Sequence, residues 1–311
     1  MSWVLAAHAV LPATMRSYIR DWDKFVKYFY DVHLGQLGRP WPASDVDFDT
    51  VMSEWVQYRF LRDTRRGTMM QCKRAVQCAR FWHPVLELPF TGKTLAGWDR
   101  LVPAGATTPV PKGLMLLLVD HFLNQGQVEL AMITAVSFEC MLRTSSELLT
   151  LLVEDVDLPG SAGDWTGSEL GAIRLRQAKS GRNQSVTLNL SVGTFLLAVV
   201  VRERQVCGDA RLCTVSPKEW RLAFAHALSS LGVPAGIFRP YALRHGGATD
   251  AFLSGEGITE VAFRGRWKFV STVEKYVRAG QAMLVTFQLP ESLRKRSRQL
   301  IQRPSLLLNR Q

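Results

Sequence analysis

The sequence lacks the patterns that mark the commonest metal, cofactor and membrane proteins. Its five cysteines are odd in number and widely spaced, with no C-x-x-C pair, which excludes a dense disulfide framework and the usual zinc sites. No apolar run reaches the roughly 18–20 residues of a membrane span. Neither a glycine-rich phosphate loop nor a G-x-S-x-G elbow is present. We therefore expect an intracellular chain with reduced thiols that does not span a membrane.

The composition is that of a globular protein with an excess of positive charge. Hydrophobic residues make up 47% of the 311 residues and charged residues 21%, so the chain can bury a core in each of two domains. The formal net charge is +11, and the segment 291–311 alone holds six lysines and arginines against one glutamate. Such an excess favours a polyanion as partner, with nucleic acid as the first choice. A merely soluble basic protein is the alternative that charge alone leaves open.

The segment 1–96 is expected to form a helical DNA-binding domain. Apolar residues recur at helical spacing in 16–30, 49–61 and 68–82. Basic side chains cluster around the last of these segments. The cluster indicates a surface that follows a phosphate backbone, although it is also typical of a solvated helix face. The candidate DNA-binding residues are Arg62, Arg65, Arg66, Lys73, Arg74 and Arg80.

A break at 97–111, rich in proline, glycine and threonine, predicts a linker to a second domain over 112–290. This domain begins with two apolar helical segments. Alternating apolar residues then predict a β-hairpin over 171–190, with its turn at 179–182, before helical segments resume. The expected fold class is therefore mainly α with a small antiparallel β-sheet (α+β). The basic segment 291–311 is expected to form a tail or helix.

Four short motifs follow one another in the second domain. The first reads M-L-R-T-S-S-E-L-L over 141–149, and the second reads R-Q-A-K-S-G-R over 176–182. The third is Y-A-L-R-H-G-G-A-T over 241–249. The fourth is R-G-R-W over 264–267, with Tyr276 nine residues after its tryptophan. In this order they resemble the signature of the tyrosine recombinase (phage integrase) family: L-R-x-S-E-L-L, the turn K-T-G-K/R, H-x-L-R-H-x-x-A-T, L-G-H/W and T-x-x-x-Y.

The resemblance covers about residues 112–278 and implies DNA strand cleavage and rejoining without a metal ion or cofactor. In this family a tyrosine hydroxyl attacks a DNA phosphodiester, which gives a 3′-phosphotyrosine and a free 5′-hydroxyl. Arginines stabilise the charge of the transition state, a lysine protonates the leaving oxygen, and an indole N–H contacts the phosphate. Carried over to this sequence, the catalytic residues are Arg143, Lys179, Tyr241, Arg244, Trp267 and Tyr276, with Tyr276 as the nucleophile, Lys179 as the general acid and His245 in a supporting role.

The resemblance also implies double-stranded DNA as the partner, held between a helical core-binding domain and the catalytic domain. Self-assembly from dimer to tetramer on DNA is expected, with the C-terminal helix passing to a neighbouring subunit. The location would be the nucleus in a eukaryote, where the basic run 294–298 could act as an import signal, and the cytoplasm or nucleoid in a bacterium. Type IB topoisomerase-like strand relaxation and a catalytically impaired, domesticated DNA-binding protein are the alternatives.

Two positions depart from the family pattern. The third motif opens with Tyr241 instead of histidine, and a tyrosine, with an ordinary pKa near 10, is a poor general base at pH 7. Proton removal from Tyr276 would then be slower, or would be assisted by His245 or the phosphate. Glu147 stands four residues after Arg143 instead of three, and a one-residue bulge would restore the alignment.

Overall fold

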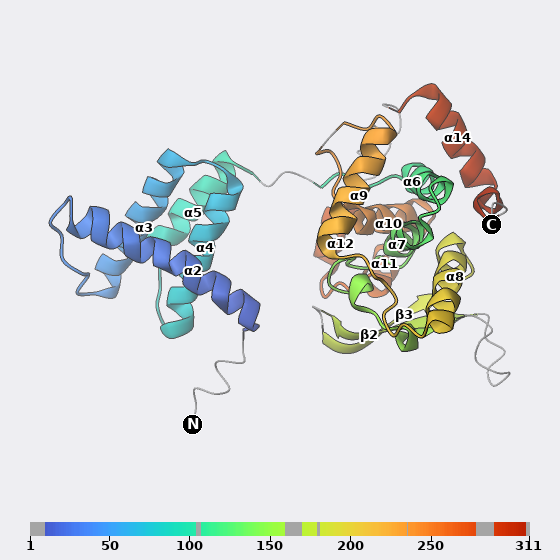
Figure 1. The fold of residues 1–311 in the computed structure, drawn as a ribbon. Helices are drawn as coiled ribbons and strands as arrows, with labels where there is room; N and C mark the ends of the chain where they lie inside the picture. Colours follow the sequence, from blue (N-terminus) through green and yellow to red (C-terminus); the bar gives the residue numbers. More distant parts are fainter. Residues whose placement is uncertain are drawn as a thin grey trace. The chain divides into compact units, whose positions relative to one another are not determined.

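The computed structural model describes residues 10–103, 107–158, 170–178, 181–234, 236–277 and 289–308, with the side chains of 177, 178, 181–183, 275 and 276 outside this description. The chain divides into two units, Met1–Ala106 and Thr107–Gln311 (Figure 1). In the described ranges, no helix is long and apolar enough to cross a membrane. The predicted fold class is confirmed, because the elements are mainly helices with a small antiparallel sheet.

The described part of the first unit is a set of helices around an aromatic-rich core. Helix α2 (Pro12–Tyr28) continues into the π-helical turn η1 (Phe29–Leu34), and α3 (Asp45–Arg62), α4 (Arg66–Trp82) and α5 (Pro89–Leu101) follow. Several of the aromatic rings meet edge to face, which adds to the stabilisation from their buried area. The core includes Phe25, Phe29, Met52, Trp55, Met69, Leu95 and Trp98.

Helix α5 corrects the expected linker, because residues 97–101 of the predicted break are helical. Its start is fixed by Asp49 of α3, whose carboxylate accepts the backbone N–H groups of Phe90 at 2.7 Å and Thr91 at 2.9 Å. Trp98 lies on the buried face of the helix and donates its indole N–H to a backbone carbonyl at 3.1 Å. The capping carboxylate lies far away in the sequence, and the local start signal is Pro89 at the first helical position, not an N-cap side chain.

The second unit is organised around the apolar helix α7 (Val128–Glu139), which is buried along most of its length. Helices α6 (Lys112–Asn124), α8 (Val192–Cys207) and α10 (Ala242–Leu253) pack against it. Their apolar side chains form the core of the unit, because each helix turns an apolar face toward α7. The further helical elements are η2 (Leu148–Thr150), η3 (Val153–Asp155), α9 (Pro217–Ser230), α11 (Ile258–Arg264), α12 (Val270–Tyr276), α14 (Glu291–Gln302) and η4 (Pro304–Leu307).

The predicted hairpin is present as β2 (Gly171–Ala178) and β3 (Gly181–Leu188). A short strand, β1 (Val156–Asp157), pairs with β2, so the antiparallel sheet has the order β1-β2-β3. The buried carboxylate of Asp155 fixes β2 to the preceding turn, because it accepts the Nε–H groups of two β2 arginines at 2.7 and 3.1 Å.

Two adjacent glycines let α10 approach α7 closely. A Cβ atom on Gly246 would lie 2.2 Å from the carbonyl oxygen of Val110, and one on Gly247 would lie 2.0 Å from that of Phe138. Any larger residue here would push α10 outward. The Gly-Gly pair of the third motif therefore has a packing role, which keeps Arg244 of the same helix in the protein interior.

Helix α14 packs on α6 of its own chain (Figure 1). Leu300 is fully buried in this contact. The guanidinium of Arg296 donates to both carboxylate oxygens of Asp120, at 3.1 and 2.9 Å. The exchange of this helix with a neighbouring copy stays a prediction.

We expect Leu300→Ala to destabilise the second unit by about 2–5 kcal/mol, because removal of a fully buried leucine leaves a cavity. Ile301→Ala is the matched control, because this neighbouring side chain is 45% exposed and its removal costs much less. Thermal unfolding followed by circular dichroism would measure the difference, at about 2–4 °C per kcal/mol for a unit of this size. Equal, small shifts for both variants would contradict the packing of α14 on α6.

Candidate active site

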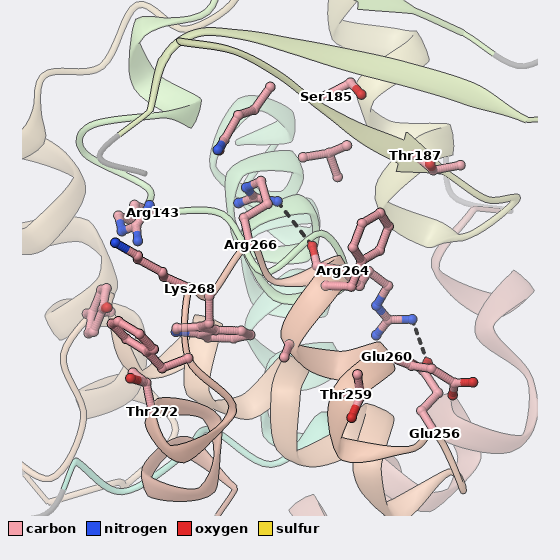
Figure 2. Close-up of a pocket in the computed structure, with 17 residues that line it drawn as sticks. Arg143, Ser185, Thr187, Glu256, Thr259, Glu260, Arg264, Arg266, Lys268 and Thr272 are labelled. Atoms are coloured by element: carbon pink, nitrogen blue, oxygen red, sulfur yellow. Dashed lines mark hydrogen bonds and ion pairs between the residues drawn. The ribbon is translucent and has the colours of Figure 1, made fainter. Parts of the chain in front are cut away.

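A cavity of about 1700 Å³ lies in the second unit, bordered by β3, the start of α10 and the segment from α11 to α12. Figure 2 shows Ser185 and Thr187 on the strand at the top of the view, with Arg143, Arg266 and Lys268 below them. Basic side chains therefore gather on one side of the cavity. This distribution suits an anionic ligand.

Arg244 packs behind Trp267, which lines the cavity, and is fully buried. Its guanidinium donates to two backbone carbonyls, including that of Gly265 at 2.6 Å, and lies 4.3 Å from the centroid of the Trp267 ring. Burial lowers the pKa of Arg244 to about 10, with a further contribution from the charges of Arg143 and Arg266. The group stays protonated at neutral pH, so a desolvated positive charge stands behind the cavity wall.

The Glu147 carboxylate joins three guanidiniums, and we call Glu147, Arg143, Arg244 and Arg266 the arginine cluster. The carboxylate accepts the backbone N–H of Arg143 at 2.8 Å and a hydrogen bond from its guanidinium. It lies 3.1 Å from Nη2 of Arg266 and 4.0 Å from Nη1 of Arg244. Burial by itself raises the pKa of Glu147, but the backbone N–H and the three cations outweigh it and hold the pKa below its ordinary 4.5. The cluster therefore keeps an excess of positive charge.

The first motif forms a wide turn that brings Glu147 back to Arg143. The N–H of Leu148 donates to the carbonyl of Arg143 at 3.4 Å, and the N–H of Leu149 donates to that of Thr144 at 2.9 Å. These two hydrogen bonds span five residues, but the shorter bond to the Arg143 carbonyl comes from the N–H of Glu147, four residues on, at 2.8 Å, and the segment is a turn and not a helix. A bulge within a helix, which would restore the family spacing, is therefore not what this segment forms; the turn itself brings Glu147 to Arg143.

Tyr241 and His245 lie one turn apart at the start of α10. Tyr241 lines the cavity and is 40% exposed, whereas His245 is buried. Their rings meet edge to face, with centroids 5.3 Å apart. Tyr241 is therefore the member of this pair that faces the cavity.

Lys179 and the side chain of Tyr276 lie outside the described residues. The elements that lead to them border the cavity, because residues 184–187 of β3 and Thr272 of α12 line it. The backbone of α12 ends at Tyr276. Among the described catalytic candidates, Arg143, Tyr241 and Trp267 line the cavity, and Arg244 lies behind it.

No family model and no curated protein matches the sequence, but solved structures match the fold. One is the XerH site-specific recombinase bound to a palindromic difH substrate in a post-cleavage complex. Its TM-score is 0.62 at 13% identity, over 84% of this chain and 75% of that chain. Another is the Tn1549 transposon integrase in complex with transposon right end DNA. Its TM-score is 0.58 at 11% identity, over 88% of this chain and 99% of that chain.

This chain has the tyrosine recombinase fold. At 11–13% identity the likeness is one of fold. The roles of individual residues therefore rest on the geometry of the cavity and on the motifs.

In this tyrosine recombinase fold, three of the predicted DNA-binding side chains in the first unit are only partly exposed and have carboxylate partners. Arg66 lies 2.8 Å from Asp99, which also pairs with Lys73. Arg74 lies 2.5 Å from the buried carboxylate of Asp21. These ion pairs reduce the positive charge that α4 can offer to DNA.

The other three DNA-binding candidates are exposed. Arg65 pairs with Asp63 at 2.7 Å, and its side chain is 84% exposed. Arg62 lies 4.2 Å over the ring of Tyr58. Arg80 lies on the exposed side of α4. Of the predicted set, Arg62 and Arg80 have no carboxylate partner within the described residues, so their charge is the least neutralised.

Sequence reasoning missed three basic residues of the cavity, Arg264, Arg266 and Lys268. The available signal was the second arginine of R-G-R-W, directly before Trp267. Glu147 was noticed only for its spacing, since its burial among three cations depends on segments that are distant in the sequence.

We expect Glu147→Gln to destabilise the second unit by about 3–5 kcal/mol at pH 7, because the largely buried guanidiniums lose their counter-charge. The pKa of Glu147 is lowered on folding, so its charge contributes stability above the ordinary value of 4.5. That contribution is lost as the pH falls through the lowered folded value. Urea unfolding should show a difference in the free energy of unfolding between wild type and variant. This difference should be constant above about pH 5 and become smaller at lower pH.

The matched control is Glu154→Gln, which removes a carboxylate whose side chain is 67% exposed and which pairs with Arg176. We expect a change below about 1 kcal/mol for this surface pair. If Glu147→Gln lowers the free energy of unfolding no more than the control does, or lowers it more in acid than at pH 7, the Glu147 carboxylate does not stabilise the arginine cluster.

Proposed function

We propose that this chain is a site-specific DNA recombinase or integrase that cleaves and rejoins DNA strands through a 3′-phosphotyrosyl intermediate. The observation that carries the proposal is the arginine cluster at the cavity, where three guanidiniums share one carboxylate. Such a cluster suits a phosphate group that gains negative charge in the transition state. The matching folds belong to a recombinase and a transposon integrase whose structures were both solved with DNA bound, which supports the same partner here.

In the proposed reaction, the hydroxyl oxygen of Tyr276 attacks the phosphorus of a DNA phosphodiester. The new O–P bond links the tyrosine to the 3′ end, the bond from phosphorus to the 5′ oxygen breaks, and Lys179 protonates that oxygen. Negative charge grows on the non-bridging oxygens, which Arg143 and the indole N–H of Trp267 would contact. Arg244 contributes its charge from behind the wall. Attack by a 5′-hydroxyl on the phosphotyrosine rejoins the strands and releases Tyr276.

Tyr241 takes the place that the family pattern gives to histidine. Its exposed position at the cavity allows its hydroxyl to donate a hydrogen bond to the phosphate. The proton of the Tyr276 hydroxyl then passes to a phosphate oxygen or to His245. Tyr241 would therefore position the phosphate rather than act as the base.

The proposed partner is double-stranded DNA, on which the chain assembles as a dimer to tetramer. Recombination joins strands from two duplexes, so more than one Tyr276 has to act in a complete exchange. A strand-relaxing enzyme of the type IB topoisomerase kind would act alone on one duplex. A catalytically impaired clamp would bind DNA without cleavage.

Covalent trapping tests the proposed chemistry. Wild-type protein and Tyr276→Phe are incubated with supercoiled plasmid and with a pool of nicked duplexes, and SDS then stops the reaction. We expect a protein–DNA adduct that maps to Tyr276 with the wild type and none with the variant, because phenylalanine has no hydroxyl to attack phosphorus. Arg143→Ala should still bind DNA but form the adduct more slowly, by on the order of 100-fold or more.

The products separate the proposed function from its alternatives. Relaxed plasmid without exchanged strands would favour the topoisomerase-like activity. Salt-sensitive DNA binding without any adduct, across the whole pool, would favour the impaired clamp. An adduct that persists in Tyr276→Phe would refute the assignment of the nucleophile.

The salt dependence of DNA binding tests the first unit. We expect Arg80→Ala to reduce the slope of log affinity against log salt concentration by about 0.9, the value for one phosphate contact on duplex DNA. Lys73→Ala is the matched control on the same helix, and it should change the slope less because Asp99 already pairs with Lys73. Fluorescence anisotropy with a duplex at several salt concentrations gives both slopes. Equal slopes for wild type and Arg80→Ala would exclude Arg80 as a phosphate contact.

A further inference from the structure

Arg266 has a backbone conformation that favours glycine. Its φ is 57°, and the other positive-φ residue besides glycine in the described ranges is Met141, at 49°. The left-handed region is unfavourable for side chains with a Cβ atom. In the family pattern L-G-H/W, glycine stands before the last residue, where this chain has Arg266 before Trp267. The chain therefore has an arginine at a position where glycine would adopt the observed backbone conformation at a lower free-energy cost.

The Arg266 side chain is directed into the protein interior and is 7% exposed. Nη2 lies 3.1 Å from Oε2 of Glu147 and 3.3 Å from the carbonyl oxygen of Met141. Nη1 donates to the carbonyl of Arg264 at 3.3 Å (Figure 2). Burial opposes the charge and lowers the pKa of Arg266, while Glu147 counteracts this effect. Folding therefore places this guanidinium in the interior although both the backbone conformation and the loss of hydration oppose it.

Glu147 divides its attraction between Arg266 and Arg143. Its Oε1 accepts a hydrogen bond from the Arg143 guanidinium, and its Oε2 faces Arg266. Arg143 lines the cavity, so a phosphate that enters has to compete with Glu147 for this guanidinium. Because Arg266 partly neutralises the carboxylate, it weakens the hold of Glu147 on Arg143.

We propose that Arg266 is a positioning residue of this chain, which holds the Glu147 carboxylate so that Arg143 can exchange it for a DNA phosphate oxygen. The inference rests on the proposed function and deepens it. Arg266 itself stays on Glu147 when the phosphate binds. The family pattern has glycine at this position, so the contact between Arg266 and Glu147 is not part of that pattern.

The decisive comparison is between Arg266→Gly and the double variant Glu147→Gln/Arg266→Gly. We expect Arg266→Gly to slow adduct formation by on the order of 100-fold, the effect of a misplaced catalytic group, because Glu147 then retains Arg143. Glycine suits the left-handed backbone, so the variant should fold. In the double variant no carboxylate retains Arg143, and the rate should recover at least several-fold over that of Arg266→Gly.

Two further variants separate a positioning role from others. Arg266→Lys keeps the positive charge and should recover part of the rate. Arg264→Gln is the matched control, because it removes an arginine from the same cavity wall whose partner is Glu256, and it should slow the reaction far less. Melting temperatures of all variants show whether a lost rate reflects lost structure.

The outcomes distinguish this inference from the proposed function. If the double variant is as slow as Arg266→Gly, Arg266 contacts the phosphate itself. If Arg266→Gly forms the adduct at the wild-type rate, Arg266 has no role in the reaction. Either result overturns the inference. If the wild type forms no adduct, the recombinase proposal fails. The same comparison is then made on affinity for a plain duplex, which requires no cleavage. Weaker binding by Arg266→Gly that the added Glu147→Gln reverses supports the inference, and unchanged binding, or no binding by the wild type, overturns it.

Discussion

The candidate active site depends on one buried carboxylate shared by three guanidiniums. Glu147 joins the first motif, α10 and the turn after α11, because Arg143, Arg244 and Arg266 come from these segments. At an effective dielectric constant of about 20, two unit charges 4 Å apart interact by about 4 kcal/mol, so each contact matters. Desolvation of the guanidiniums opposes the arrangement. The cluster has three positive charges and one negative charge, so its guanidiniums repel one another. An incoming phosphate would add negative charge and reduce this repulsion.

Close packing at glycine positions helps to hold this charge arrangement in place. The adjacent Gly246 and Gly247 let α10 lie against α7, which carries Arg244 into the interior. A Cβ on Gly265 would overlap the Trp267 ring at 1.6 Å, so glycine is needed there for the ring to lie against the chain. The wide turn after Arg143 supplies the third constraint. Each of these features sits inside a motif, so the motif residues serve the fold as well as the proposed chemistry.

The sequence predicted those features that depend on local pattern. The alternation in 171–190 predicted the hairpin. Features that depend on distant partners were missed. Helix α5 is capped by Asp49 of α3, and its Gly97 was interpreted as the start of a linker. Only Arg143 and Arg244 of the arginine cluster were predicted as site residues. No pattern in R-G-R-W shows that the Arg266 side chain points inward to a carboxylate from another motif.

The same reasoning changes the meaning of the net charge of +11. In the first unit, Asp99 and Asp21 neutralise much of the basic face of α4, so a count of lysines and arginines overstates the charge available to DNA. In the arginine cluster positive charge exceeds negative charge, since three guanidiniums share one carboxylate. Positive charge is therefore concentrated at the arginine cluster, and less of it is available along α4. A protein that only coated DNA would gain little from burying Arg244, whereas a group that stabilises one transition state gains most when it is desolvated and fixed in advance.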